Sequence, residues 1–176
     1  MRKTLQLLLM VIAAIFLSGC SGDDSPPLST FEDADVIGQW VLIEINSTPQ
    51  IDIGNDGTTD TNLMLQTTCF DGWGLNFDAN GTITSDAAEI ELDPNAIATL
   101  ICSPISNSGT YVINGNDITV STMVDGIAES QTVTVNITNN LMSFDATESD
   151  VAGLFNIPDG EFYSNLTSLE FVLQKI

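Results

Sequence analysis

The sequence contains no histidine among its 176 residues. Histidine is the side chain that most often acts as a general base, a proton shuttle or a transition-metal ligand, because its pKa lies closest to neutral pH. Its absence removes the enzyme classes that rely on a histidine base and the commonest ligand for transition metals. The sequence also lacks a glycine-rich phosphate-binding loop. We therefore expect a protein that is not an enzyme.

Basic side chains are nearly as scarce as histidine. Lysine and arginine together number 3 against 24 acidic residues, which gives a net charge of −21. Arg2 and Lys3 stand at the start of the chain, so Lys175 is the only basic residue beyond them. Binding of nucleic acid requires cationic side chains that displace phosphate counterions, and one lysine cannot do this. The composition therefore excludes a nucleic-acid partner and argues against attachment to anionic lipid headgroups.

The amino terminus has the organisation of a secretory leader. Arg2 and Lys3 precede an apolar run from Leu5 to Leu17 that is too short to span a bilayer stably. The segment Leu17-Ser18-Gly19-Cys20 follows and resembles the lipobox of bacterial lipoproteins. The resemblance implies that residues 1–19 are a cleaved signal peptide and that Cys20 is the lipidation site. Several acyl chains would then anchor the protein to a membrane.

Residues 20–34 are expected to comprise the cysteine that the resemblance marks for lipidation and an acidic tether, because the segment after Cys20 is small, acidic and proline-bearing. The pair Asp23-Asp24 resembles the export signals that carry lipoproteins to the cell surface in Bacteroidetes-type bacteria. The expected location is therefore the outer membrane at the cell surface, with the lipid as the membrane contact. Residues 35–176 remain for one folded domain, since 43% of the chain is apolar.

Two cysteines, Cys69 and Cys102, remain after Cys20 is acylated. An even pair in an extracytoplasmic compartment is expected to form a disulfide. Closing a loop of this length would stabilise the fold by roughly 3 to 4 kcal/mol in the chain-entropy model. The alternative, a free catalytic thiol, is disfavoured because no neighbouring base is available to lower the pKa of the thiol.

From Val36 onward the chain consists of short β-branched and aromatic runs separated by turn dipeptides, without a long helical period. Three such dipeptides, Asn80-Gly81, Asn114-Gly115 and Asp125-Gly126, accept the positive φ angles of type I′ hairpin turns. The pattern predicts an all-β antiparallel meander that closes into a β-barrel of about eight strands, with a sandwich as the alternative. The strands are expected at Val36–Ile45, Trp73–Phe77, Gly81–Thr84, Thr110–Ile113, Ile118–Val124, Ile127–Ile137, Leu141–Phe144 and Leu169–Leu173.

The first and last expected strands carry a paired signature. Gly38-Gln39-Trp40 lies in the first, and Lys175 continues the alternating row Leu169, Phe171 and Leu173 in the last. This pattern resembles lipocalin-like barrels, which begin with a Gly-x-Trp strand and end with a basic residue lying across the tryptophan. The resemblance implies that Gly38, Trp40 and Lys175 close one end of the barrel. The simpler interpretation of these residues is a purely structural plug.

The sequence resembles most closely the lipocalin-like lipoproteins of Bacteroidetes, over roughly residues 35–176. The elements that stand in the order of that family are Ile37-Gly38-Gln39-Trp40, the Asp-rich loop, Cys69-Phe70, Leu75 to Thr82, Gly109-Thr110-Tyr111, Asn114-Gly115-Asn116 and the terminal strand. The resemblance implies a ligand-binding barrel. Two departures are the lysine in place of arginine and the long acidic stretch from Asp145 to Glu161.

The loop from Asp52 to Asp60 resembles half of an EF-hand calcium loop. Asp52, Asp56 and Asp60 match positions one, five and nine of that pattern, and Gly57 matches position six. Gly54 stands at position three and Leu63 at position twelve, so the bidentate glutamate is missing. The loop is thus a candidate site for calcium of weak affinity, and an Asx-rich solvated turn is the alternative.

Other carboxylates offer little chemistry. Glu89 and Glu91 share one strand face and could serve glycoside hydrolysis, but a solvated face is the simpler interpretation. Two functional hypotheses therefore stand. The first is a membrane-anchored lipoprotein whose lipocalin-like barrel binds a small apolar ligand. The second is a non-enzymatic surface module that recognises a glycan or a partner protein through its loops.

Overall fold

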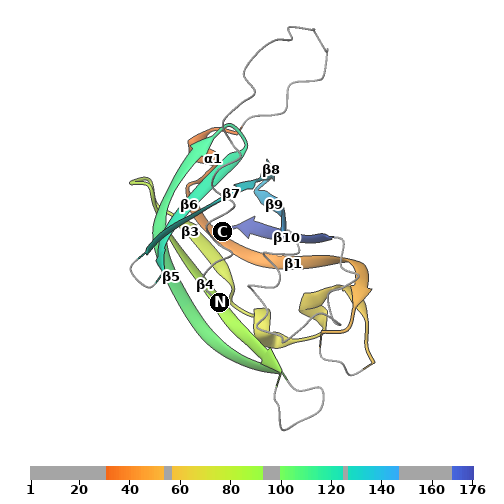
Figure 1. The fold of residues 1–176 in the computed structure, drawn as a ribbon. Coiled ribbons are helices and arrows are strands. Elements are labelled where there is room, and N and C mark those ends of the chain that lie inside the picture. Colours follow the sequence, from red (N-terminus) through yellow and green to blue (C-terminus); the bar gives the residue numbers. More distant parts are fainter. Residues whose placement is uncertain (1–30, 54–56, 93–99, 125–126, 147–167) are drawn as a thin grey trace, which may run out of the picture.

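The computed structural model describes residues 31–53, 57–92, 100–124, 127–146 and 168–176 (Figure 1). None of the helices in these residues is long and apolar enough to cross a bilayer. The elements are α1 (Asp33–Val36), β1 (Gly38–Ile51), β2 (Asp60–Asn62), η1 (Leu63–Leu65), η2 (Thr68–Phe70), β3 (Gly74–Phe77), β4 (Thr82–Leu92), β5 (Leu100–Asn114), β6 (Asp117–Val124), β7 (Ile127–Thr134), β8 (Asn136–Thr138), β9 (Leu141–Ala146) and β10 (Ser168–Lys175).

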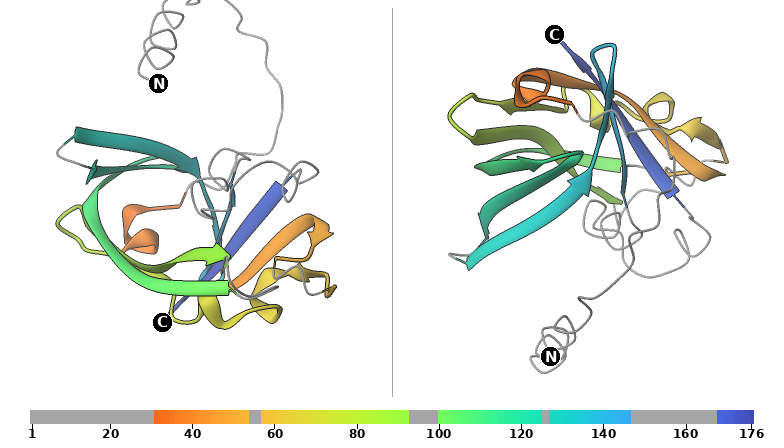
Figure 2. Two further views of the ribbon diagram at one scale, coloured as in Figure 1. Left: turned by 60° about the horizontal axis from the view of Figure 1, so that its bottom comes forward. Right: turned by 90° about the horizontal axis from the view of Figure 1, so that it is seen from above.

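The described strands form one antiparallel sheet with the order β7-β6-β5-β4-β3-β1-β10-β9-β8, and β2 pairs with β1. The pairing of β1 with β10 brings the two ends of the domain together, and the sheet curls into a half-barrel (Figure 2). The two ends of the hydrogen-bonded order, β7 and β8, are consecutive in the chain and are separated only by Val135. The expected all-β antiparallel meander of lipocalin-like type is confirmed. It has ten strands rather than about eight, because β2 and β8 add three residues each.

A β-bulge in β1 keeps its apolar side chains on the inner face. The register with β10 shifts between Leu42 and Glu44, so that Ile43 is the extra residue. Trp40 and Leu42 are buried before the bulge, and Ile45 is buried after it, whereas Ile43 is exposed. Successive strand residues face opposite sides, so an inserted residue reverses the parity of those that follow. The sequence analysis did not anticipate this bulge.

Two of the three expected hairpin turns lie in described residues and connect consecutive strands. Gly81, between β3 and β4, has φ 84°, and Gly115, between β5 and β6, has φ 64°. Asn80 and Asn114 do not have positive φ, so the expected type I′ geometry was wrong at both dipeptides. A third turn with positive φ joins β8 to β9, at Asn139 (53°) and Asn140 (64°). Asparagine tolerates this region better than other residues with a side chain. Asp125-Gly126 lies outside the described residues.

The bounds of four expected strands were wrong. The first was expected at Val36–Ile45, but β1 extends to Ile51 and Val36 belongs to α1. β4 runs to Leu92 rather than Thr84, and β5 begins at Leu100 rather than Thr110. The two strands pair continuously in register from Thr82 to Leu92, so their hydrogen bonds sustain a ribbon that shows no apolar alternation in the sequence. The single expected strand Ile127–Ile137 is divided at Val135, whose N–H donates to the Asn116 carbonyl, 2.8 Å away. The chain there changes its partner from β6 to β9.

The buried side chains form one cluster, which extends from the interior of the half-barrel to the 3₁₀ turns η1 and η2. Its largest fully buried members include Trp40, Phe70, Leu63 and Met142. The Gln66 side chain helps to hold the loop between β1 and β3. Its amide donates to the Ile51 carbonyl (2.8 Å) and accepts from the Ile53 N–H (3.1 Å). The loop therefore contributes to the core instead of lying on the surface.

Candidate ligand-binding site

The concave face of the sheet borders a cavity of about 870 Å³. Side chains from β1, β3, β4, β5, β6, β7, β9 and β10 line it. Ile118, Val120 and Thr122 on β6 line it at every second position, as do Gln131 and Val133 on β7. This spacing arises because alternate residues of a strand face the same side. The volume lies within the range of about 300 to 1,000 Å³ that is typical of small-molecule sites.

One part of the cavity wall is apolar and well packed. Leu42, Phe77, Met142, Phe171 and Leu173 line it and are each at most 6% exposed. The rings of Phe144 and Phe171 stack with centroids 5.2 Å apart and planes 9° from parallel. This wall is built from β1, β3, β9 and β10, the strands around the paired ends of the domain. It can offer a ligand a continuous apolar surface.

The other part of the wall carries polar groups on β4, β5 and β6. Ser85 and Glu89 lie in the same alternating row of β4 as Ile83, and Asn107 lies opposite Ser85 on β5. Thr122 belongs to the same face, because it is paired with Gly109, which is opposite Ile83. Among the described lining residues, none is lysine or arginine. The cavity therefore combines an apolar wall with hydroxyl, amide and carboxylate groups.

Trp73 stands between the cavity and the loop that precedes β3. It lines the cavity and is 7% exposed. Its carbonyl accepts from the Leu42 N–H (3.0 Å), and its ring meets Phe70 edge to face with centroids 5.1 Å apart. Among the described residues, its buried indole N–H has no hydrogen-bond acceptor. Buried donors are usually satisfied, so this group has an unused capacity to bind an acceptor.

A short helix and the last strand meet at one end of the half-barrel. The Trp40 indole N–H donates to the Val36 carbonyl in α1 (2.7 Å). Trp40 and Lys175 are directly paired across β1 and β10, and Lys175 Nζ lies 5.5 Å from the Trp40 ring centroid. The same ammonium donates to the carbonyls of Asp35 (2.8 Å) and Ala34 (3.3 Å). Lys175 thus links β1, β10 and α1.

Gly38 has a steric reason to be glycine at this end. Its φ is 131°, and a Cβ at this position would lie 3.0 Å from Lys175 Cε. A side chain there would be strained and would push the lysine stem away from its place. The structure therefore brings together Gly38, Trp40 and Lys175, the three residues singled out in the sequence. Their role in closing the barrel remains a prediction.

Tyr111 lies near the same end, on β5. Its hydroxyl donates to the Asp78 carbonyl (2.9 Å), and its ring meets Phe77 edge to face with centroids 5.0 Å apart. Burial raises the pKa of the Tyr111 phenol above its ordinary value of 10.0, with smaller contributions from the charges of Asp33 and Asp78. The folded protein therefore keeps the proton of this phenol to a higher pH than a free tyrosine does.

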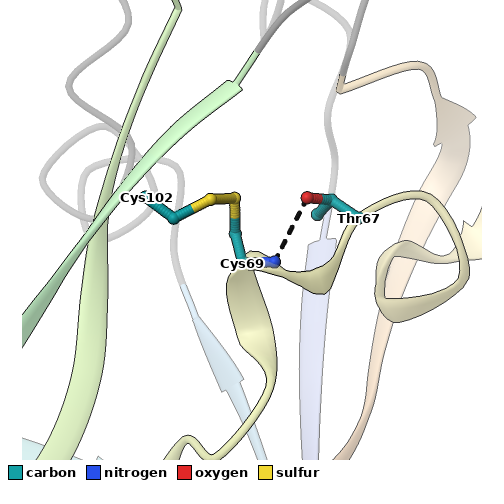
Figure 3. Close-up of a disulfide and its surroundings, with 3 residues drawn as sticks. All are labelled: Thr67, Cys69 and Cys102. Carbon is teal, nitrogen blue, oxygen red and sulfur yellow. Dashed lines mark hydrogen bonds between the residues drawn. A yellow bond between two sulfur atoms is a disulfide. The ribbon is translucent and has the colours of Figure 1, made fainter.

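The expected disulfide between Cys69 and Cys102 is confirmed (Figure 3). It joins η2 to β5, with Cα atoms 5.3 Å apart. The Thr67 hydroxyl accepts from the Cys69 N–H (3.2 Å) and caps η2. Phe70, the residue after Cys69, is fully buried and packs against Trp73. The disulfide therefore fixes the turn that supports one side of the cavity.

The candidate calcium loop can be followed only in part, because Asp56 lies outside the described residues. Asp52 Oδ2 accepts from the Gly57 N–H (2.6 Å), and Asp60 Oδ1 accepts from the Asn62 N–H (3.0 Å). No group of three potential metal ligands occurs among the residues that the structure describes. Calcium binding at this loop remains a prediction.

Of the two glutamates considered for glycoside hydrolysis, only the side chain of Glu89 is described. It is exposed and lines the cavity from β4. Asp145 also borders the cavity, and most of the acidic stretch that follows it lies outside the described residues. The leader and Cys20 lie outside them too. α1 includes Asp33 and Ala34, which the sequence analysis assigned to the tether.

The model of the family described as lipocalin-like domain matches residues 36–144. The match covers more than half of the chain, and the protein belongs to the lipocalin-like domain family. No curated protein matches the chain. A solved structure that is similar to it is the crystal structure of an uncharacterized protein from Bacteroides eggerthii DSM 20697. The two share 13% identity with a TM-score of 0.40, over 80% of this chain and 98% of that chain.

The sequence analysis placed two cavity residues, Phe171 and Leu173, in the alternating row of the last strand, but it did not single out Trp73. The sequence signal that could have identified Trp73 is its position in the alternation of side chains that continues along β3. Trp73 falls in the same alternating row as Leu75 and Phe77, so the row that defines the inner face of β3 begins at Trp73. That its indole N–H lacks a partner depends on the three-dimensional arrangement and has no signature in the sequence.

Proposed function

We propose that the protein is a binding lipoprotein whose lipocalin-like domain holds a small apolar molecule in the cavity of about 870 Å³. The observation that carries this proposal is the cavity itself, because it lies on the concave face of the sheet and is lined mainly by apolar side chains. Apolar surface of this kind gains free energy when a ligand removes it from water, at about 25 cal/mol per Å². No catalytic role is proposed for the residues that line it.

The test is a binding measurement with a neutral environment-sensitive dye such as Nile red, followed by native mass spectrometry of protein purified from its own host. Dye binding with a stoichiometry of one, and a retained small molecule in the mass spectrum, are expected. The variant Ala87→Trp places a large side chain in the cavity wall on β4 and should weaken dye binding at least about tenfold.

A matched control is Ala128→Trp, which makes the same substitution at an exposed position on β7 that does not line the cavity. It should leave dye affinity unchanged. If both variants bind the dye as the natural protein does, the cavity is not the binding site and the proposal fails. Melting temperatures close to that of the natural protein would show that a loss of dye binding in either variant is not caused by unfolding.

We further propose that the domain is held by lipid on Cys20 at the outer membrane and faces the cell exterior. The support is the leader and lipobox-like segment together with the acidic residues that follow. Cys20→Ala should release the protein from membranes, and its retention after a high-salt wash would contradict the lipid anchor. Protection of the natural protein from protease added to intact cells would place the domain on the inner side of the membrane.

The interaction-module hypothesis has weaker support. A surface that binds glycans or proteins through its loops is typically enriched in exposed aromatic side chains. In the described part of the chain, the large exposed hydrophobic residues are all aliphatic, among them Val112, Met123 and Ile127. The described aromatic rings instead contribute to the core and the cavity wall.

A further inference from the structure

We propose that the cavity selects uncharged amphiphiles, molecules with an apolar body and one hydrogen-bond acceptor such as a carbonyl or ether oxygen, and that it rejects carboxylates. This inference rests on the proposed binding function and specifies its ligand class. Two independent observations carry it: the charge pattern of the cavity lining and the unpartnered indole N–H of Trp73.

The charge pattern disfavours an anionic ligand. Lys175 is the only basic residue within the described parts of the chain, and it does not line the cavity. Its ammonium is already bonded to the carbonyls of Ala34 and Asp35. Glu89 on the inner row of β4 adds a negative charge to the lining, within a chain of net charge −21. A carboxylate would lose hydration in this cavity without gaining a counter-charge, which is costly.

The unpartnered indole N–H of Trp73 favours a ligand that carries a hydrogen-bond acceptor. Trp73 is 7% exposed, lines the cavity and has no acceptor for its Nε1–H among the described residues. A buried unsatisfied donor costs free energy, and a ligand oxygen that accepts this hydrogen removes the cost. A cationic head group cannot accept it. The tryptophan therefore points to a neutral ligand with an acceptor rather than a cationic one, even though the carboxylates of the lining by themselves would favour a cation.

The test uses four probes that share one alkyl chain length and differ in the head group: the alkane, the methyl ketone, the fatty-acid carboxylate and the alkyltrimethylammonium ion. Each displaces Nile red from the full protein, below the concentration at which the probe forms micelles. We expect the carboxylate to bind at least about tenfold more weakly than the ketone. Equal affinities for these two probes would overturn the charge argument.

The variant Trp73→Phe removes the N–H and keeps an aromatic ring. Because one hydrogen bond contributes about 0.5–1.5 kcal/mol, the ratio of ketone affinity to alkane affinity should fall by roughly two- to tenfold. Trp40→Phe is the matched control, since it makes the same change away from the cavity lining. In Trp40→Phe the ratio of ketone affinity to alkane affinity should equal that of the natural protein. An unchanged ratio in Trp73→Phe would overturn the role of the donor.

Two further measurements decide the question even if Trp73→Phe does not fold. The indole N–H signals of the natural protein can be followed by NMR during titration. The Trp73 signal should move downfield with the ketone and not with the alkane, while Trp40, already bonded to Val36, serves as the internal reference. Glu89→Gln should raise the affinity for the carboxylate roughly two- to fivefold relative to the affinity for the ketone.

The outcomes separate this inference from the proposed function. If no probe displaces the dye, and the dye itself does not bind, the binding function fails. If all four probes bind and the Trp73 signal responds to none of them differently, the binding function stands and the ligand class proposed here is wrong. Preferential binding of the alkyltrimethylammonium ion over the ketone would likewise overturn it.

Discussion

Removing the charge of Lys175 should destabilise the domain without affecting the cavity. The variant Lys175→Met keeps an apolar stem over Trp40 and removes the ammonium, which lies 5.5 Å from the ring centroid and bonds to two carbonyls of α1. A cation over an indole contributes about 0.5–1 kcal/mol at an exposed site. The charged hydrogen bonds add to this, but solvent screening reduces them because the head group is only half-buried. The expected loss is about 1–2 kcal/mol.

The assay is equilibrium unfolding in urea, where the loss appears as a lower midpoint at an unchanged slope. Gln174→Met is the matched control, because Gln174 is the exposed neighbour on the same strand. It should change stability by less than about 0.5 kcal/mol. Lys175→Arg should retain most of the stability, since a guanidinium can also stack on the indole. Dye affinity should be the same in all three variants.

A double-mutant cycle with Trp40→Leu isolates the contact itself. Each single variant also loses other interactions, such as the bond from Trp40 to the Val36 carbonyl, but these cancel in the cycle. The remaining coupling should be about 0.5–1 kcal/mol. Additivity of the two substitutions within about 0.3 kcal/mol would refute the argument that the ammonium and the indole stabilise each other.

Three further predictions concern other parts of the fold. Replacing both Cys69 and Cys102 by serine should cost roughly 3 to 4 kcal/mol in urea unfolding, because a separation of 33 residues is released, and it should abolish the effect of a reductant on the natural protein. Stability should fall as the pH rises beyond 10.0, since the unfolded chain releases the Tyr111 proton there while the folded state, with its raised pKa, retains it; Tyr111→Phe should reduce that fall. Gly109→Ala should cost about 1–3 kcal/mol in the same assay, because a Cβ there would lie against the Ser121 carbonyl oxygen.

The sequence predicted the fold correctly where local side-chain alternation and turn residues agree with the burial and strand pairing found in the structure. Val133 and Val135 alternate with polar neighbours, and so do Phe171 and Leu173, so the amino-acid pattern alone indicates one buried face. The Asn-Gly turns have few alternative conformations and fix the hairpins beside them. Lys175 was recognisable because it continues the parity of its strand and is the only basic residue of the domain.

What the sequence did not predict depends on partners that are distant in the chain. Residues 100 to 108 of β5 are half-buried or exposed and include Pro104, so neither alternation nor propensity marks them as a strand. They form one because β4 supplies an unbroken hydrogen-bonding partner. The bulge at Ile43 likewise arises from the register with β10. Local preference is overridden in both places by pairing across the sheet.

The two stabilising devices of the domain differ in their relation to the cavity. Lys175, Trp40 and α1 form a contact whose members do not line the cavity, so its strength can change without altering what the cavity binds. The disulfide is different. It holds η2, whose Phe70 packs against Trp73, and Trp73 both lines the cavity and carries the unused donor. In the binding mode proposed above, the position of that donor would therefore depend on the disulfide, because a loosened η2 would leave the Trp73 ring without the edge-to-face contact from Phe70.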